Sequence, residues 1–159
     1  MRKYKLINNV LGWIVFLIAS TVYLMTIEPT ASFWVCGEFI SSAFKLEVGH
    51  PPGAPFFMLT ANLFTQLASD ASSVAKMVNS MSALFSGLTI LFLFWSITHL
   101  ARKIMVDDES EISLGQMITI MGSGLVGALA YTFSDTFWFS AVEGEVYAYS
   151  SLFTALVFW

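Results

Sequence analysis

The sequence has little charge and only one cysteine. Asp, Glu, Lys and Arg make up 11% of its 159 residues, whereas 57% are hydrophobic, a balance outside that of ordinary soluble domains. The single cysteine, Cys36, excludes an internal disulfide and a metal site built from several cysteines. The net charge of −4 does not create a surface for nucleic acid, because the acids are grouped in loops. The composition therefore predicts a membrane protein.

Long uncharged stretches dominate the chain. A helix needs about 20 apolar residues to cross a bilayer, and residues 6–27, 77–101 and 112–134 contain no Asp, Glu, Lys or Arg. A fourth apolar stretch, 146–159, has no charge at its end, so we expect an N-terminal piece of a longer protein. The basic start "MRKYK" resembles a signal peptide, but the first stretch is too long for one. The sequence thus predicts an all-α, polytopic membrane protein. Small residues four apart favour close helix packing in lipid: Ala83 with Gly87, Ser123 with Gly127, and Gly124 with Ala128.

The topology depends on whether residues 54–68 form a further span. At 1.5 Å per residue this helix would reach about 22 Å, which is short of the hydrocarbon thickness. Its polar residues share one face, as is typical of a helix lying at the membrane interface: Asn62, Thr65, Gln66 and Ser69. With this helix at the interface, the basic N-terminus and the segment "ARKIM" fall on the same side of the membrane. Because cytoplasmic loops carry an excess of Lys and Arg, we expect this side to face the cytoplasm.

Two long loops then share the extracytoplasmic side, at about residues 28–76 and 135–145. In the first loop, residues 33–47 predict a second membrane-lying helix that is capped by Ser32. Its polar stripe contains Glu38, Ser41, Ser42 and Lys45. Val35, one turn before Glu38, interrupts this stripe. Taken alone, such a helix is a structural element of the membrane surface.

The segment "GHPPGAP" follows and is conformationally restricted. Pro51 and Pro52 stiffen an extended stretch, and Gly53 permits a turn. His50 is thereby held on a rigid arm. The alternative is a plain turn between two interfacial helices, with His50 hydrogen-bonded for structural reasons.

The second loop contains two carboxylates, Glu143 and Glu145, among aromatic residues such as Trp138 and Tyr147. Aromatic residues at a membrane boundary are expected as an interfacial belt. Ionisable groups near the apolar zone are costly and are usually retained for pairing or function. The loops therefore predict a site on one face of the membrane.

Four segments in this order resemble a known family: "EPTASFWVCGEF", "GHPPGAPFF", "MVNSMSAL" and "SDTFWFSAVEGEVYA". They are similar to the N-terminal region of a domain-of-unknown-function family of large bacterial multi-spanning membrane proteins, related to the protein O-mannosyltransferases of the GT-C glycosyltransferase superfamily. The resemblance covers nearly the whole chain. It implies a GT-C helical bundle with two membrane-lying helices in the first extracytoplasmic loop, in a bacterial inner membrane. It also implies transfer of a sugar from a polyprenyl-phosphate carrier to Ser or Thr of exported proteins.

One position departs from the family pattern. Family members usually carry Asp where this chain has Val35, although Trp34, Cys36, Gly37, Glu38 and Phe39 match. Valine cannot accept a proton, so three interpretations stay open: the chain is inactive or altered, Glu38 supplies the carboxylate, or Glu143 or Glu145 does. The resemblance and the loops together nominate Glu38, Glu143 and Glu145 as catalytic residues, with Trp34, His50, Pro51, Pro52, Gly53 and Tyr147 as substrate-binding residues. A divalent metal at the phosphate leaving group is left open.

Two other classes of function compete with a transferase. In a transporter or lipid-linked glycan flippase, Glu143 and Glu145 would line a substrate or proton path. A catalytically inactive membrane scaffold is the third class, and Val35 makes this class less remote. The position of Cys36 in the first loop predicts that an impermeant maleimide reaches its thiol from outside the cell once the site is accessible.

Overall fold

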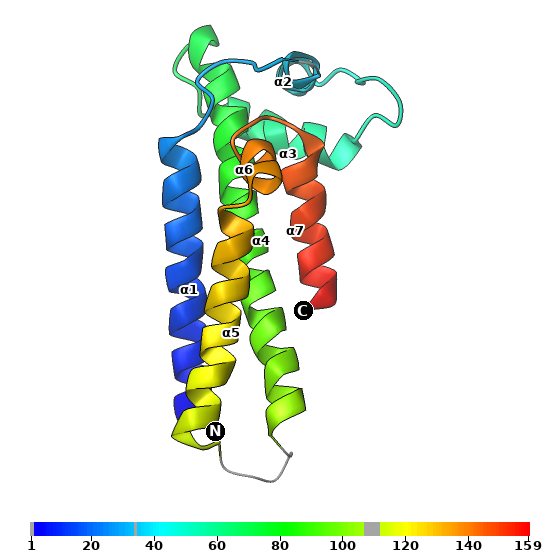
Figure 1. The fold of residues 1–159 in the computed structure, drawn as a ribbon. Coiled ribbons are helices and arrows are strands. Elements are labelled where there is room, and N and C mark those ends of the chain that lie inside the picture. Colours follow the sequence, from blue (N-terminus) through cyan, green and yellow to red (C-terminus); the bar gives the residue numbers. More distant parts are fainter. Residues whose placement is uncertain (1, 34, 107–111) are drawn as a thin grey trace.

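The computed structural model describes residues 2–33, 35–106 and 112–159, and it is built from helices. Three long helices run side by side: α1 (Arg2–Met25), α4 (Val74–Met105) and α5 (Leu114–Thr132) (Figure 1). In the described part of the chain, these are the three helices long and apolar enough to cross a membrane. The 3-10 turn η1 (Ala71–Ser73) directly precedes α4 and extends this span. The prediction of an all-helical membrane chain is confirmed for the described residues, whereas the GT-C layout stays a prediction.

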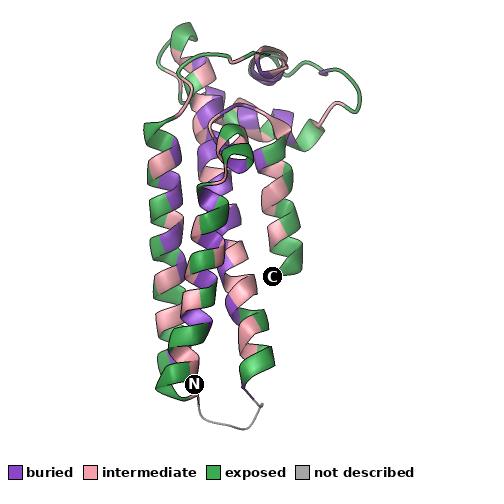
Figure 2. Cartoon of the chain, viewed as in Figure 1, coloured by how far each residue is buried: buried purple, intermediate pink, exposed green. Residues whose placement is uncertain are grey.

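Helix α4 is the centre of the bundle and packs against α1, α5 and α7 (Val146–Phe158). Over half of its apolar window, 56%, is buried, compared with 28% for α1 and 22% for α5. Small residues allow the close approach that lipid-embedded helices need. A Cβ on Gly124 would lie 2.6 Å from Cγ2 of Thr98, and a Cβ on Gly87 would collide with Ser20 of α1. Figure 2 shows the buried positions along the mutually facing sides of these helices.

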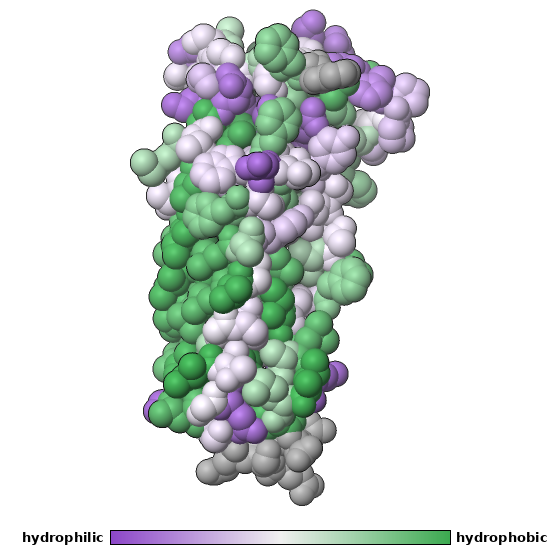
Figure 3. Space-filling view, viewed as in Figure 1, coloured by the Kyte–Doolittle hydropathy of each residue, from purple (hydrophilic) through white to green (hydrophobic). Residues whose placement is uncertain are grey.

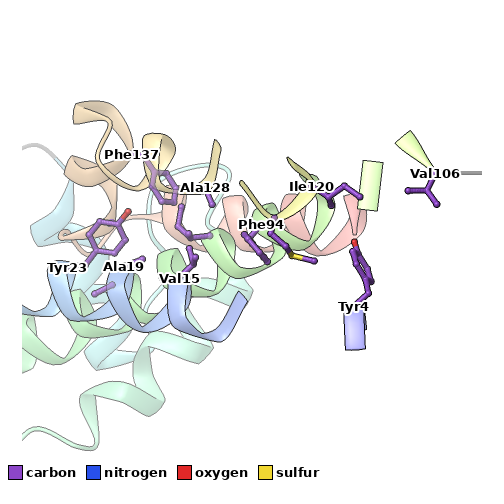
Figure 4. Packing of buried hydrophobic residues seen from close by; sticks show 13 residues of the cluster. Tyr4, Val15, Ala19, Tyr23, Phe94, Val106, Ile120, Ala128 and Phe137 are labelled. Atoms are coloured by element: carbon purple, nitrogen blue, oxygen red, sulfur yellow. The ribbon is translucent and has the colours of Figure 1, made fainter. Parts of the chain in front are cut away.

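The core between α1, α4 and α5 is mainly apolar, and its buried hydroxyls include that of Tyr23. The Tyr23 hydroxyl donates a hydrogen bond of 2.8 Å to the carbonyl oxygen of Thr132. The ring of Tyr23 lies near that of Phe137 (Figure 4). Outside the core, Figure 3 shows a broad hydrophobic band along the bundle, with hydrophilic residues gathered at its ends. This distribution matches a bundle that spans the apolar layer of a membrane.

The short helices gather at one end of the bundle (Figure 1). They are α2 (Cys36–Lys45), α3 (Pro55–Thr65) and α6 (Asp135–Ala141). Nδ2 of Asn62 in α3 donates hydrogen bonds to the carbonyl oxygens of Ala43 and Phe44, at 2.9 and 3.2 Å. These carbonyls belong to the last turn of α2, where helices leave acceptors without partners. Asn62 therefore joins the two short helices.

The structure corrects part of the prediction for α2. The helix begins at Cys36, and Val35 occupies its N-cap position without a side-chain cap. The predicted range 33–47 is therefore longer than the helix, and the prediction that Ser32 caps it is wrong. Helix α2 ends at Lys45, and the C-cap residue Leu46 has a left-handed backbone with φ of 54°.

Helix α3 has 11 residues, and it is not among the described helices long enough to cross a membrane. Part of its polar stripe is turned toward the protein, because Asn62 binds α2 and Thr65 is only 3% exposed. Its outer side is apolar instead, with Phe56, Leu59 and Leu63 exposed. Such a face is suited to contact with lipid.

Candidate active site

The two predicted carboxylates of the second loop lie in a tight bend between α6 and α7. The backbone N–H of Glu145 donates a 2.9 Å hydrogen bond to the carbonyl oxygen of Glu143. Gly144 between them has no room for a side chain, since a Cβ there would lie 2.8 Å from Oδ1 of Asn79 and 3.1 Å from Cγ1 of Ile40. The bend is therefore pressed against α2 and α4, which fixes the position of both carboxylates.

The Cys36 thiol lies between these carboxylates. Its Sγ is 3.4 Å from Oε2 of Glu143 and 3.2 Å from Oε1 of Glu145. The three possible ligand atoms lie within 4.8 Å of one another. Cys36 is 1% exposed and Glu143 is 6% exposed. Glu145 is partly buried. The start of α2 and the second loop are thus joined by a compact and largely buried polar cluster.

The environment of Cys36 keeps its thiol protonated. Burial raises the pKa of the thiol to about 12, and the negative charges of Glu145 and Glu143 add to the increase. At neutral pH the thiol therefore acts as a weak hydrogen-bond donor. It has one proton, so it donates fully to only one of the two carboxylates at a time.

Glu38 has a different partner. Its Oε1 accepts a hydrogen bond of 2.6 Å from the backbone N–H of His50, and its Oε2 lies 3.0 Å from Nδ1 of the same residue. The backbone hydrogen bond and then the ring contact hold the pKa of Glu38 below its ordinary value. Its side chain is 41% exposed. Glu38 thereby ties the arm that carries His50 to α2.

The arm has a restricted backbone, as the sequence predicted. Gly53 has φ of +87°, in the region that favours glycine, and Ala54 follows with φ of 38°. Pro55 then occupies the first position of α3, where proline needs no backbone N–H. The ring of Phe39 lies 5.6 Å from that of His50. The arm is therefore fixed on α2 at one end and on α3 at the other.

A cavity of about 220 Å³ lies where the arm meets the second loop. Five of the predicted site residues line it: His50, Pro52, Gly53, Glu145 and Tyr147. The remaining lining comes from Val35, Phe39, Ala54 and Val146. Val35, the position where the resembling family carries Asp, therefore faces the same space as Glu145 and His50.

The other predicted residues stand outside this lining. Glu38 contacts His50 of the lining, and Pro51 is adjacent in the chain. Glu143 is connected to the lining residue Glu145 through the Cys36 thiol. Trp34 lies outside the described residues. A larger cavity of about 570 Å³ between α4, α5 and α7 contains hydroxyl groups but no acid, histidine, lysine or arginine, so we assign the chemistry to the smaller one.

Cys36 is the polar residue in contact with the predicted carboxylates that the sequence did not nominate for the site. Its only signal was its place in the segment "FWVCGEF". Nothing in the sequence pairs it with carboxylates more than a hundred residues away, because that contact depends on how α2 packs on α4.

Comparison with known proteins identifies the family. Residues 36–159 match the family described as the protein O-mannosyl-transferase TMEM260 N-terminal domain. The chain is 26% identical to the protein O-mannosyl-transferase tmem260 of Dictyostelium discoideum over 91% of its length, and 28% identical to the TMEM260 protein of Mus musculus over 90%. These alignments span 16% and 18% of the two relatives. No solved structure matches the chain significantly. The chain therefore belongs to the family of the TMEM260 N-terminal domain.

Proposed function

We propose that the chain is the N-terminal part of a membrane glycosyltransferase of GT-C architecture. It transfers a sugar from a polyprenyl-phosphate carrier to a Ser or Thr hydroxyl of an exported protein. The observation that supports this most is the match to a family of O-mannosyl-transferases in a chain whose two loops enclose a cavity lined by His50 and Glu145.

The proposed chemistry needs a base and a group at the phosphate. Glu145 accepts the proton of the acceptor hydroxyl while the acceptor oxygen bonds to the sugar C1. The bond between C1 and the phosphate oxygen breaks, and the polyprenyl phosphate leaves. His50, which lines the same cavity, contacts the phosphate. Tyr147, Pro52 and Gly53 shape the space for the substrate, and Pro51 and Trp34 belong to the same binding region.

The substitution at Val35 makes the choice of base important. Glu38 is the first alternative, but both of its oxygens contact His50, so we assign it the positioning of the arm. Glu143 is buried against the Cys36 thiol. Glu145 lines the same cavity as Val35, which makes it the best-placed carboxylate to replace the missing Asp.

The proposed orientation follows from charge. The N-terminus and the loop before α5 face the cytoplasm of a bacterium, and the site faces outward from the inner membrane. In this orientation the carrier lipid, the exported acceptor and the cavity share one side.

The test uses the full-length protein in vesicles with a polyprenyl-phosphate-linked sugar and a Ser/Thr-containing acceptor peptide. We expect Glu145→Gln to lower transfer by about 10²-fold or more, the usual contribution of a general base. Glu47→Gln is the matched control, because the Glu47 side chain is exposed, pairs with Lys45 and does not line this cavity. Equal transfer by the two variants would remove Glu145 from the chemistry.

A complementation experiment tests the reaction class. The glycan mass on exported proteins is measured in a deletion strain that carries the unmodified gene or Val35→Asp. Restoration by the unmodified gene means that Asp is not needed at position 35, and restoration by Val35→Asp alone means that this chain is a disabled transferase. If the glycan does not change on deletion, while vesicles move the lipid-linked sugar across the bilayer, the protein is a flippase instead.

A further inference from the structure

The cluster of Cys36, Glu143 and Glu145 has the geometry of a single-ion site. A tetrahedral zinc ion has metal–sulfur and metal–oxygen distances of about 2.3 and 2.1 Å, which places sulfur and oxygen about 3.6 Å apart. The observed sulfur–oxygen distances are 3.4 and 3.2 Å, so small shifts of the side chains would accommodate the ion. Cys36 begins α2, and Glu143 and Glu145 lie in the bend between α6 and α7.

The cluster also lacks the partners that would explain it as a finished structural feature. Glu143 is buried, and among the described residues the one hydrogen-bond partner of its carboxylate is the Cys36 thiol. Glu145 shares that thiol, and a single S–H group cannot satisfy both carboxylates. No Lys, Arg or His in the described part of the chain lies within 4.0 Å of either carboxylate. A buried carboxylate without a cation, such as that of Glu143, is costly.

A further buried acceptor points at the same bend. Oδ1 of Asn79 is enclosed and has no hydrogen-bond partner, and it would lie 2.8 Å from a Cβ on Gly144. The Asn79 amide nitrogen is already occupied, because it donates to the carbonyl oxygens of Glu28 and Thr30. This fixes the direction of the amide, with its oxygen toward the segment that carries both carboxylates. A buried bend with this excess of acceptors is suited to a cation.

We propose that Cys36, Glu143 and Glu145 bind a thiophilic divalent cation of the Zn²⁺ class. A sulfur ligand disfavours Mg²⁺ and Ca²⁺, which prefer oxygen. On binding, the S–H bond of Cys36 breaks, the sulfur bonds to the ion, and the proton passes to the solvent buffer. Three protein ligands leave a fourth position open, as in catalytic zinc sites.

The bound ion would hold Glu145 at the edge of the 220 Å³ cavity. The proposal stands on the cluster itself and does not depend on the proposed sugar transfer, so each can fail alone.

The test measures metal in the full-length protein, purified without chelator, by mass spectrometry of the elements. We expect about one zinc ion per chain that depends on this site. In Cys36→Ser and in the isosteric Glu143→Gln, the affinity should fall by about 100-fold or more, since loss of an outer-shell partner alone costs about 10–100-fold. Glu38→Gln is the matched control, because Glu38 lies on the same helix but contacts His50.

Cobalt substitution gives a second readout that reports on the ligand itself. Co²⁺ bound to the wild-type protein should show a thiolate charge-transfer absorption, which Cys36→Ser removes and Glu38→Gln retains. Far-ultraviolet circular dichroism identifies a variant that fails to fold, and Glu143→Gln then replaces it, because this change preserves both side-chain shape and the thiol. Zinc and cobalt binding that is unchanged in both Cys36→Ser and Glu143→Gln overturns the proposal, and so does a wild-type protein that binds neither ion.

Discussion

Glu38 accepts two contacts from His50, because one carboxylate oxygen lies 2.6 Å from the backbone nitrogen and the other lies 3.0 Å from Nδ1. This pairing makes the rigid arm dependent on pH. The pKa of Glu38 is lowered in the folded protein by the His50 backbone N–H and then by its ring. A lowered folded-state pKa stabilises the arm above the unfolded-state value of about 4.3. That contribution is lost as the pH falls through the lower folded-state value.

The first prediction follows from the lowered pKa of Glu38. Hydrogen-exchange protection of the His50 amide should decrease on acidification below about pH 4.3, once it is corrected for the intrinsic exchange rate. Glu38→Ala should reduce the protection already at pH 7, whereas Glu47→Ala, in an exposed pair with Lys45, should not. Protection at pH 7 that is the same in both variants would mean that Glu38 does not hold the arm.

A second prediction concerns Asn79, which ties the first loop to α4. Its Nδ2 donates hydrogen bonds to the carbonyl oxygens of Glu28 and Thr30, at 2.7 and 3.0 Å, and the residue is buried. Asn79→Ala leaves these acceptors without a partner, so we expect the free energy of unfolding to fall by about 1–3 kcal/mol. Equilibrium unfolding in detergent measures the change. Ser80→Ala is the neighbouring control, because the Ser80 hydroxyl bonds only within its own helix.

Much of this architecture was readable from the sequence. Uncharged stretches predicted the long helices, since every membrane-spanning backbone must satisfy its own hydrogen bonds. The proline-rich arm was predicted because Pro and Gly restrict the backbone locally. In contrast, the partner of Glu38 was not predicted. The spacing of Glu38 relative to the other polar residues of α2 indicated only a polar face of the helix. The contact with His50 depends on how the arm folds back over α2.

The contacts of Cys36 and of two polar residues of α3, Asn62 and Thr65, could not be predicted from local sequence either. Periodicity shows that Asn62 and Thr65 share a face, but not what that face contacts. Here it contacts the end of α2, and the apolar side is left outside. The contact between Cys36 and Glu143 spans 107 residues, and no local pattern encodes a contact of that kind. Local rules thus predicted the elements, whereas the site depends on tertiary packing.

A third prediction compares two glycines of α5. A Cβ on Gly124 would lie 2.6 Å from Thr98 and 2.8 Å from Phe94, whereas a Cβ on Gly122 meets nothing within 4 Å. Gly124→Ala should therefore destabilise the bundle by about 1–3 kcal/mol through overpacking. Gly122→Ala introduces the same methyl group in the same helix and should cost nothing measurable. Unfolding of both variants in one detergent provides the comparison, and equal stabilities would contradict the close packing of α4 and α5.

The fourth prediction concerns the reactivity of Cys36. With a pKa of about 12, its thiolate fraction at pH 7 is on the order of a thousandfold lower than that of an ordinary cysteine with a pKa of about 8.5. Its side chain is also only 1% exposed. In the folded protein with chelator present, maleimide should therefore modify Cys36 very slowly, and denaturation should make the reaction fast. Rapid labelling of the folded protein would contradict both the burial and the raised pKa.

This slow reaction means that Cys36 cannot report the orientation of the folded protein, so a second position is needed. Ser72 is exposed and lies in the turn η1, just before α4. The start of α4 is at the same end of the bundle as α2 and α3 (Figure 1). In a full-length protein with its other cysteines replaced, Ser72→Cys should react with an impermeant maleimide added to intact cells. Labelling that requires permeabilised cells would put the cavity on the cytoplasmic side, where an exported acceptor could not reach Glu145, and the proposed transfer reaction would then lose its substrate.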